Sequence, residues 1–449
     1  MPLTVESSQL AYQDHADLNA MRFLNEVIER YPNAISFASG RPSKINAQPE
    51  KWSHYIALFS HYLADARHQS LPQVAALLGQ YGDTRGIINA LIAKQLLEDE
   101  AITLAPEEIL ITNGAQEGMV ICLDTLFSPG HDVLLVTDPA YIGITGAARI
   151  KGIDVAYVEC DSEGPLISAL EYQVARIAAD GKRARAVYTI PDFSNPCGTT
   201  LSLARRQALL TFCCAQGLLV LEDSPYRLFD YADLQLPTLF ALDREAVVIH
   251  IGTFAKTLCP GVRIGYLACR TRVRQGDGSH PLIDEMTRVK SFISVNTGQI
   301  AQAIVGGFLL ENGCSLKSVM LEVRNHYREK RDRLVEGLTN CFSDSNTGLS
   351  WNVPQGGFFL NLTVPCEITR QDIERCAEEF GVIVVPTAMF SNSNRYDNVL
   401  RLSFSYVELE QIDAGVHRLS RFIKELINTA QQTPFHRDNE DASFARAKE

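Results

Sequence analysis

The stretch VVIHIGTFAKTLCPGVRIGY (247–266) decides how the rest of the chain is interpreted. It begins with an apolar, β-branched run that is typical of a strand buried on both faces, and a second such run follows at 264–270. Lys256 stands after the first run, where a buried strand ends, and an ammonium group is costly there unless it has a partner or a task. A lysine in this position indicates a functional site.

Strand-like runs of the same kind recur upstream of this stretch. Segments with helical periodicity separate several of them, for example 116–127 and 203–216, so the pattern predicts an α/β fold with a mostly parallel seven-stranded sheet covered by helices. Together with 247–254 and 264–270, the predicted strands are ILITN (109–113), DVLLVTDP (132–139), DVAYVEC (154–160), AVYTIPDF (186–193) and LLVLEDS (218–224).

The length of 449 residues exceeds what one hydrophobic core usually serves, so we expect more than one domain. A long helical stretch from about 291 to 336 is predicted after the sheet, and strand candidates at 356–362, 382–386 and 399–405 predict a smaller α+β C-terminal domain. The predicted divisions are an N-terminal segment (1–50), a large domain (51–329), a small domain (330–427) and a disordered polar tail (428–449).

The composition, 46% hydrophobic and 21% charged, is that of an ordinary globular protein. The net charge of −12 argues against nucleic acid binding, which depends on Lys and Arg. The eleven cysteines are odd in number and include no C-x-x-C pair, which favours reduced thiols, and the histidines show no metal-ligand spacing. No signal peptide and no apolar run of 18 residues is found, so we expect a cytoplasmic protein that does not bind a membrane.

Polar residues follow two more of the predicted strands, and ligands of open α/β sheets bind at the carboxyl ends of strands. Gly114–Gln116 opens a helix after 109–113, and the N–H groups of a helix N-terminus suit a phosphate, although a single glycine there is also common in a plain turn. Asp223 follows 218–222, where a carboxylate is often only a helix cap.

These residues together meet the needs of pyridoxal 5'-phosphate (PLP). PLP requires a lysine to hold its aldehyde as an imine, an acid to keep its pyridine nitrogen protonated, and donors for its phosphate. Lys256 and Asp223 supply the first two, and the Gly114 turn supplies the third with Thr253 and Arg263. Tyr226 and Asn195 also follow strands and can partner the phenolic oxygen O3'.

From Ile35 to Ile427 the chain resembles the fold-type I, class I/II aminotransferases, within the branch of the α-aminoadipate/kynurenine aminotransferases and the effector domains of MocR-type regulators. Besides the lysine stretch, the resemblance is carried by YGDTRG (81–86), ITNGAQEG (111–118), DPAYIG (138–143), PDFSNPCGT (191–199), EDSPY (222–226), PQGGFFL (354–360) and LRLSFS (400–405).

The resemblance implies a role for each matching position. Lys256 looks like the Schiff-base lysine, Asp223 the pyridinium partner, and Asn195 and Tyr226 the O3' partners. Tyr141 looks like the residue that stacks on the ring. The phosphate-site positions are Gly114, Ala115, Gln116, Thr253 and Arg263, together with Tyr81, which matches a tyrosine that reaches across a homodimer with shared active sites. The substrate positions are Gly40, Asn195 and Arg401, the last of which would bind the α-carboxylate.

Several positions depart from the family pattern. Cys197 replaces the usual Thr or Ser of N-P-[TS]-G, and the phosphate turn and the residue before the lysine carry Ala115 and Ala255 where serine is usual. Thr387 replaces a common glycine near the substrate. Arg41 follows Gly40 where an apolar residue is frequent, and it either receives a distal substrate carboxylate or is a solvated loop residue.

We therefore predict an aminotransferase that moves the amino group of an α-amino acid to a 2-oxo acid by a ping-pong mechanism through Lys256. The alternative on the same fold is a PLP enzyme of elimination, cyclisation or oxidation in a biosynthetic pathway. A MocR-type regulator would need a DNA-binding domain ahead of SFASGRPS (36–43), and about 35 residues are too few for one. We expect neither nucleic acid nor a metal as a partner.

Overall fold

The computed structural model describes residues 23, 25–43, 48–342 and 348–432. Its centre is one eight-stranded sheet with the strand order β2-β9-β8-β7-β6-β3-β4-β5. The strands are β2 (Ile109–Thr112), β3 (Asp132–Asp138), β4 (Asp154–Asp161), β5 (Gly164–Pro165), β6 (Arg183–Thr189), β7 (Leu219–Asp223), β8 (Val248–Thr253) and β9 (Gly265–Cys269).

The sheet is mostly parallel, as the apolar runs predict. The neighbours β4, β3, β6, β7 and β8 pair in parallel, while β9 runs antiparallel between β8 and β2. The seven predicted strands are present, and the eighth, β5, is a two-residue strand antiparallel to the end of β4. A strand made of one glycine and one proline has no periodicity, so the sequence pattern could not predict it.

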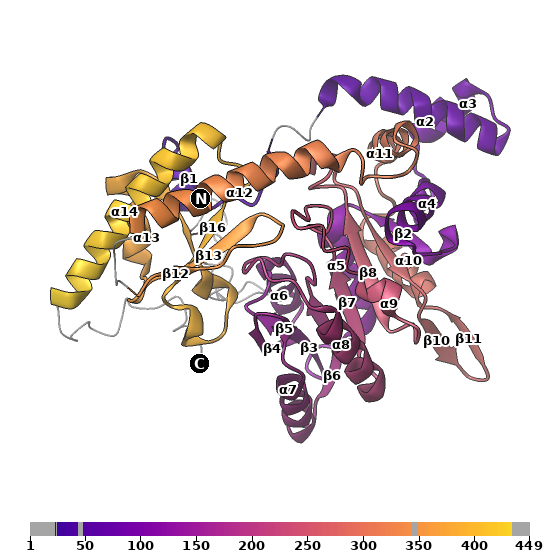
Figure 1. The fold of residues 1–449 in the computed structure, drawn as a ribbon. Helices are drawn as coiled ribbons and strands as arrows, with labels where there is room; N and C mark the ends of the chain where they lie inside the picture. Colours follow the sequence, from indigo (N-terminus) through magenta and orange to yellow (C-terminus); the bar gives the residue numbers. More distant parts are fainter. Residues whose placement is uncertain (1–22, 24, 44–47, 343–347, 433–449) are drawn as a thin grey trace, which may run out of the picture.

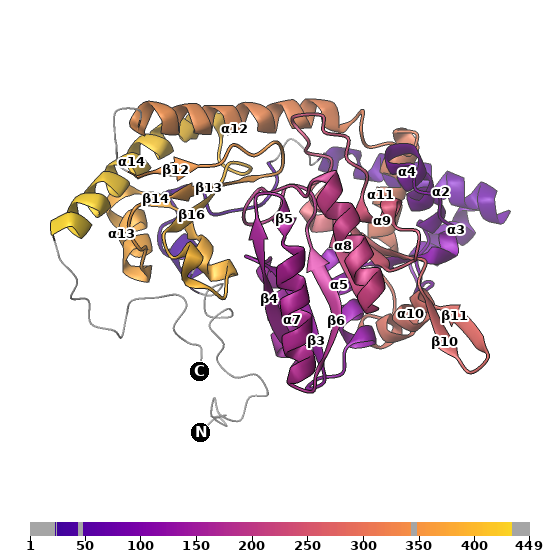
Figure 2. The same ribbon diagram turned by 60° about the horizontal axis from the view of Figure 1, so that its bottom comes forward.

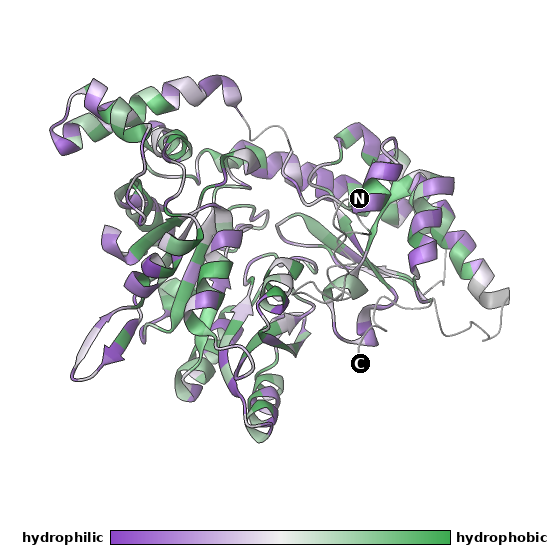
Figure 3. Ribbon diagram, turned by 180° about the vertical axis from the view of Figure 1, so that it is seen from behind, coloured by the Kyte–Doolittle hydropathy of each residue, from purple (hydrophilic) through white to green (hydrophobic). Residues whose placement is uncertain are grey.

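Helices cover both faces of the sheet (Figures 1 and 2). One face carries α5 (Gly114–Leu126), α6 (Ile142–Ile150) and α10 (Leu282–Ile293), and the other carries α7 (Ile167–Ala179), α8 (Leu203–Gln216) and α9 (Leu239–Leu242). Hydrophobic residues concentrate in the strands between these layers (Figure 3), and β2 and β9 are buried along their whole length. This double cover explains why the strands are apolar runs without alternation.

The predicted helical stretch at about 291–336 is divided among three helices. They are α10, α11 (Gln299–Glu311) and α12 (Met320–Phe342). Val295 interrupts the first connection with a φ of 63°, and Gly313 and Cys314 interrupt the second with φ values of 62°. A left-handed backbone ends an α-helix, and the apolar periodicity on either side conceals these breaks.

The C-terminal part is built on a four-stranded sheet of order β12-β13-β16-β15. Its strands are β12 (Ser350–Trp351), β13 (Phe359–Thr363), β15 (Val385–Pro386) and β16 (Val399–Ser403), and α13 (Arg370–Phe380) and α14 (Leu409–Gln432) pack against each other beside it. Helix α12 runs from the large sheet to this region in both Figure 1 and Figure 2. The hairpin β10 (Arg272–Gln275) and β11 (Gly278–Pro281) projects from the large sheet.

The N-terminal segment joins the C-terminal core. Strand β1 (Ile35–Ser36) pairs in parallel with β14 (Val382–Ile383), and Phe23, Val27 and Phe37 are buried in the same hydrophobic cluster as Leu360 and Leu402. The proposed limits of 1–50, 51–329 and 330–427 stay predictions. Helix α14 extends to Gln432, so 428–432 is helical and does not belong to a disordered tail, while 433–449 lies outside the described residues.

Candidate active site

A cavity of about 1060 Å³ opens where the large sheet, the C-terminal sheet and the N-terminal segment meet. It lies at the carboxyl ends of the parallel strands, where ligands bind in open α/β sheets. Of the residues that the sequence predicts for the site, all but Gly114 and Tyr81 line it: Gly40, Arg41, Ala115, Gln116, Tyr141, Asn195, Asp223, Tyr226, Thr253, Lys256, Arg263 and Arg401.

Lys256 follows β8 and points its amine at the N-terminal segment. Its Nζ donates a hydrogen bond to the carbonyl oxygen of Gly40 at 2.8 Å. Burial lowers the pKa of Lys256 to about 8, and the positive charges of Arg263 and Arg401 also lower it, against the opposing effect of Asp223. A lysine with this pKa is partly neutral near pH 7.5 and can act as a nucleophile and a base.

Asp223 ends β7 with only 2% of its surface exposed. Its Oδ2 accepts a hydrogen bond from the hydroxyl of Tyr188 at 2.6 Å, whereas Oδ1 is buried without a hydrogen-bond partner among the described residues. Burial raises the pKa of Asp223 to about 6, although the Tyr188 hydrogen bond, His250 and Lys256 each lower it. A buried acceptor without a donor is costly, so Oδ1 suits a ligand that brings a donor.

The turn between β2 and α5 forms the predicted phosphate site. Gly114 has a φ of +77°, and a Cβ there would lie 2.5 Å from Nη2 of Arg263. A Cβ on Gly265 would lie 2.7 Å from the backbone nitrogen of Ala115. The two glycines thus let Arg263 and β9 approach the first turn of α5, which has no side-chain cap on its N–H groups. A guanidinium beside uncapped helix N–H groups suits an anion such as phosphate.

Tyr141 directly precedes α6 and lies beside Gly143 of that helix, which is joined to Gln116 of the phosphate turn. A Cβ on Gly143 would lie 2.3 Å from the ring of Tyr141, so glycine leaves room for the ring. Gln116 donates from Nε2 to the carbonyl oxygen of Gly143 at 2.8 Å, which joins the start of α5 to α6. The ring of Tyr141 is thereby held at the cavity wall, where it can stack on a planar ligand.

Arg401 lies on β16 and is buried, with 6% of its surface exposed. It donates to Oδ1 of Asn195 at 2.9 Å and to the carbonyl oxygen of Ala38 at 2.6 Å, and its guanidinium lies 4.7 and 4.8 Å from the ring centres of Phe359 and Phe390. Its Nε has no hydrogen-bond partner among the described residues.

Burial lowers the pKa of Arg401 to about 10, which leaves the side chain protonated at neutral pH. Asn195 also hydrogen-bonds Tyr226, and burial raises the pKa of that phenol. The charged fork of Arg401 therefore reaches the cavity next to the two predicted O3' partners, where it can bind a carboxylate.

Two predicted residues stand apart from this cluster. Arg41 lines the cavity but is exposed, and no ion pair within the described ranges involves it. Tyr81 does not line the cavity, and 84% of its surface is exposed. Within one chain the structure therefore does not bring Tyr81 to the phosphate turn.

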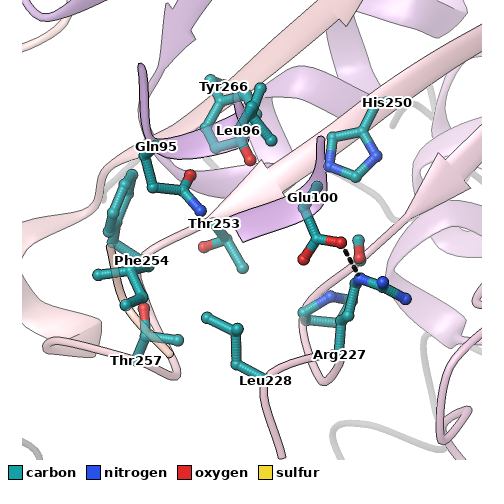
Figure 4. Close-up of a pocket in the computed structure, with 13 residues that line it drawn as sticks. Gln95, Leu96, Glu100, Arg227, Leu228, His250, Thr253, Phe254, Thr257 and Tyr266 are labelled. Atoms are coloured by element: carbon teal, nitrogen blue, oxygen red, sulfur yellow. Dashed lines mark hydrogen bonds and ion pairs between the residues drawn. The ribbon is translucent and has the colours of Figure 1, made fainter. Parts of the chain in front are cut away.

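Figure 4 shows a second cavity, of about 40 Å³, and Pro225 and Thr253 line both cavities. Gln95, Glu100 and His250 point into it, and Arg227 donates from Nε to Oε2 of Glu100 at 2.6 Å. It has room for a few water molecules but not for a cofactor or an amino acid. The larger cavity is therefore the candidate active site.

Sequence reasoning missed several side chains of the site. Tyr188 and Phe359 lie in runs that are interpreted from the sequence as strands, without a role for either residue, and Phe390 is not singled out there. A tyrosine inside the predicted strand 186–193 was the available signal for Tyr188, because a buried hydroxyl needs a partner.

Comparison with known proteins identifies the class. The profile of the family described as aminotransferase class I and II matches residues 68–419, so the chain belongs to this family. It is 39% identical to the (S)-3,5-dihydroxyphenylglycine transaminase of Amycolatopsis orientalis over 94% of each chain, and 31% identical to the 2-aminoadipate transaminase of Thermus thermophilus over 91% of this chain and 94% of the relative.

A solved structure has the same fold. The kynurenine aminotransferase of Pyrococcus horikoshii, crystallised in complex with PMP, superposes with a TM-score of 0.78 at 28% identity, over 94% of this chain and 97% of that one. The chain is a PLP-dependent aminotransferase of fold type I, and its substrates are an amino acid and an oxo acid. Elimination, cyclisation and oxidation are not favoured, because these relatives are named as aminotransferases. No described helix combines the length and the apolar character needed to cross a membrane.

Proposed function

We propose that Lys256, Asp223 and Arg401 carry out amino transfer in the cavity described above. The observation that carries this assignment is Oδ1 of Asp223, a buried acceptor without a partner among the described residues, in the same cavity as an amine whose pKa is lowered to about 8. An acceptor in that position suits the pyridine N–H of PLP.

When bound, PLP supplies an aldehyde that condenses with amines and a ring that takes up electrons from the substrate α-carbon. Arg401 binds the α-carboxylate of the substrate through its charged fork. The substrate amine takes the place of Lys256, whose neutral Nζ then accepts the proton from the α-carbon and delivers it as general base and acid. Water supplies the keto oxygen with which a first amino acid leaves as an oxo acid, and the amino group that it gives up passes to a second oxo acid, which is ping-pong transfer.

The remaining assignments hold the cofactor. Asn195 and Tyr226 would donate to O3', and Tyr141 would stack on the ring. The N–H groups of Gly114–Gln116, Thr253 and Arg263 would bind the phosphate.

The amino donor is an amino acid with an aromatic side chain. Tyr31, Ile142, Phe359 and Phe390 line the cavity and offer apolar and aromatic surface to such a side chain. The relative at 39% identity is named for a dihydroxyphenyl amino acid, which supports this substrate class. Gly40 closes over the substrate with its backbone.

The acceptor is a dicarboxylic 2-oxo acid whose distal carboxylate binds Arg41. The exposed guanidinium of Arg41 lines the cavity and forms no ion pair within the described ranges. The relative named for 2-aminoadipate acts on a compound with such a distal carboxylate, which supports this role.

The enzyme is a cytoplasmic homodimer in which Tyr81 completes the phosphate site of the partner subunit. The apolar exposure at the end of α10 and the start of α11 supports an interface, since Phe292 is 89% and Ile300 56% exposed, and Tyr81 is exposed as well. Sedimentation of the full chain would report a dimer, and a monomer with full activity would contradict shared sites.

The activity is tested with PLP-loaded protein and single amino acids in the absence of any oxo acid. Aromatic amino acids should convert the bound cofactor to pyridoxamine phosphate and release one equivalent of oxo acid per site. Phenylalanine and leucine form a useful pair. Their side chains are similarly hydrophobic, so a difference between them reports the effect of the aromatic ring. Ammonia release with PLP unchanged would contradict transamination, and a preference for leucine would contradict the aromatic donor.

A further inference from the structure

Tyr188 is a buried residue of the site to which the proposed function gives no role. It lies on β6 opposite Leu221 of β7, so its side chain is one strand away from Asp223 at the end of β7. Only 1% of its surface is exposed, and its hydroxyl donates to Oδ2 of Asp223 at 2.6 Å.

The direction of this hydrogen bond is fixed by burial. Burial and the neighbouring charge of Asp223 hold the pKa of the Tyr188 phenol well above its ordinary value, so the phenol keeps its proton and is the donor. Oδ2 of the carboxylate is thereby occupied, and Oδ1 is the oxygen left for a ligand. A hydrogen bond to the charged form of a carboxylate favours that form.

Other titratable groups face Asp223 as well, from several elements. Tyr141 and Tyr226 lie on loops around the cavity, Lys256 follows β8, and His250 lies on β8 with Nδ1 at 3.0 Å from Oε2 of Glu222. His250 and Lys256 act on Asp223 through their charge, and the backbone N–H of Ser224 also lowers its pKa, whereas the Tyr188 hydroxyl is the side-chain group that hydrogen-bonds Oδ2. The orientation of the carboxylate therefore depends on Tyr188.

We propose that Tyr188 is a positioning residue for the cofactor. Its hydroxyl keeps the Asp223 carboxylate anionic and orients it so that Oδ1 faces the pyridine nitrogen of PLP. The proposal rests on the proposed role of Asp223 as the pyridine partner. A tyrosine that only packs the sheet would contribute to stability but would not change the pyridine–carboxylate pair.

The substitution Tyr188→Phe removes this one hydroxyl and keeps the ring. Without the hydrogen bond, the carboxylate rotates more freely and its pKa rises, so a smaller fraction of Asp223 is ionised at acidic pH. We expect PLP to bind about tenfold more weakly, kcat to fall about tenfold, and the acid limb of the kcat profile to move up by about one pH unit, since hydrogen bonds to charged groups have effects of this order. KM for the amino acid should stay within about twofold.

Tyr266→Phe is the matched control. Tyr266 is also a buried tyrosine of the same sheet, with 6% of its surface exposed, but it lines the smaller cavity and not the cavity of Asp223. PLP affinity and the pH profile of Tyr266→Phe should stay within about twofold of the wild type, because this hydroxyl does not line the cavity of Asp223. A Tyr188→Phe protein with unchanged PLP affinity and an unchanged acid limb would overturn the proposal, as would equal shifts in both variants.

Asp223→Asn distinguishes a failure of the role proposed for Tyr188 from a failure of the role proposed for Asp223. If Asp223→Asn binds PLP and turns over normally, the role of Asp223 is wrong; if it fails and Tyr188→Phe is normal, only the role of Tyr188 is wrong. A crystal structure of the PLP-loaded wild type gives an answer even if Tyr188→Phe does not fold. Oδ1 should face the pyridine nitrogen with Tyr188 on Oδ2, and a pyridine contact to Oδ2 would contradict the proposal.

Discussion

The two sides of the active-site cavity are built in different ways. The cofactor side, defined by Asp223, Lys256 and Gly114–Gln116, comes from strand ends of one sheet and the turns that follow them. The substrate side, defined by residues 38–41 and Arg401, comes from the segment after β1 and from β16, near the two ends of the chain. Cofactor binding and substrate recognition should therefore respond separately to substitution.

Hydrogen bonds join the two sides. Lys256 donates to the carbonyl oxygen of Gly40, and Arg401 donates to the side chain of Asn195, which follows β6 of the large sheet. The first bond uses a backbone carbonyl, so side-chain changes in residues 38–41 leave its acceptor in place. The comparison teaches that substrate preference can change in this fold without rebuilding the cofactor site.

The largest effect on the cofactor side is expected from Lys256→Ala. Transamination should fall by about 10⁴-fold or more, because both the covalent attachment and the proton transfer are lost. The measurement is turnover together with peptide masses after borohydride treatment, where the cofactor should be trapped on Lys256 of the wild type alone. Lys290→Met is the control, since Lys290 is a fully buried lysine outside the cavity, and trapping on Lys290 would contradict the assignment.

Arg401→Lys tests whether the substrate side acts independently. The charge is retained but the planar fork is lost, so KM for the amino donor should rise about 100-fold through the loss of two charge-assisted hydrogen bonds. PLP affinity should stay within about threefold. Equilibrium titration with PLP and steady-state kinetics give the two numbers, and equal losses in both would show that the two sides are one unit.

The pH dependence of PLP capture sharpens the comparison on the cofactor side. The pKa of Lys256 is lowered to about 8 by burial, so the neutral amine predominates above pH 8 and the ammonium form below it. The rate at which the cofactor-free protein captures PLP should therefore fall about tenfold per pH unit below 8 and level off above it. Stopped-flow absorbance gives this rate, and a profile that still rises at pH 10 would mean an ordinary, solvated lysine.

Arg41→Gln is expected to have the smallest and most selective effect. KM for a dicarboxylic 2-oxo acid should rise about tenfold, because one charged contact to the distal carboxylate is lost. KM for an aromatic donor should change less than twofold. Paired half-reaction kinetics measure both values, and an unchanged KM for the dicarboxylic acid would make Arg41 a solvated loop residue.

The sequence predicted the cofactor side better than the substrate side, for a physical reason. Strand ends of a parallel sheet share one edge, so Asp223 and Lys256 could be brought together from their positions alone. The hydrogen bond from Lys256 to Gly40 and the rings of Phe359 and Phe390 around Arg401 depend on how distant segments pack, and no local pattern encodes such packing.

The same distinction applies to the fold. Long apolar runs predicted the seven main strands, whereas β1 and β5 have two residues each and exist only through their partners. The breaks within the predicted helical stretch at 291–336 were not predicted, because Val295 and Cys314 adopt left-handed backbone without being glycine. Tertiary contacts impose such conformations, and they cannot be predicted from residue type.

The pairing of β1 with β14 has a consequence for the order of events on the ribosome. Strand β1 emerges first, but its partner at 382–383 and the core that buries Phe37 are translated near the end. The large sheet, by contrast, is complete once β9 has been made. Since domains fold as units during synthesis, the large sheet forms before the partner of the N-terminal segment has been made. The enzyme therefore acquires its substrate side only as translation finishes.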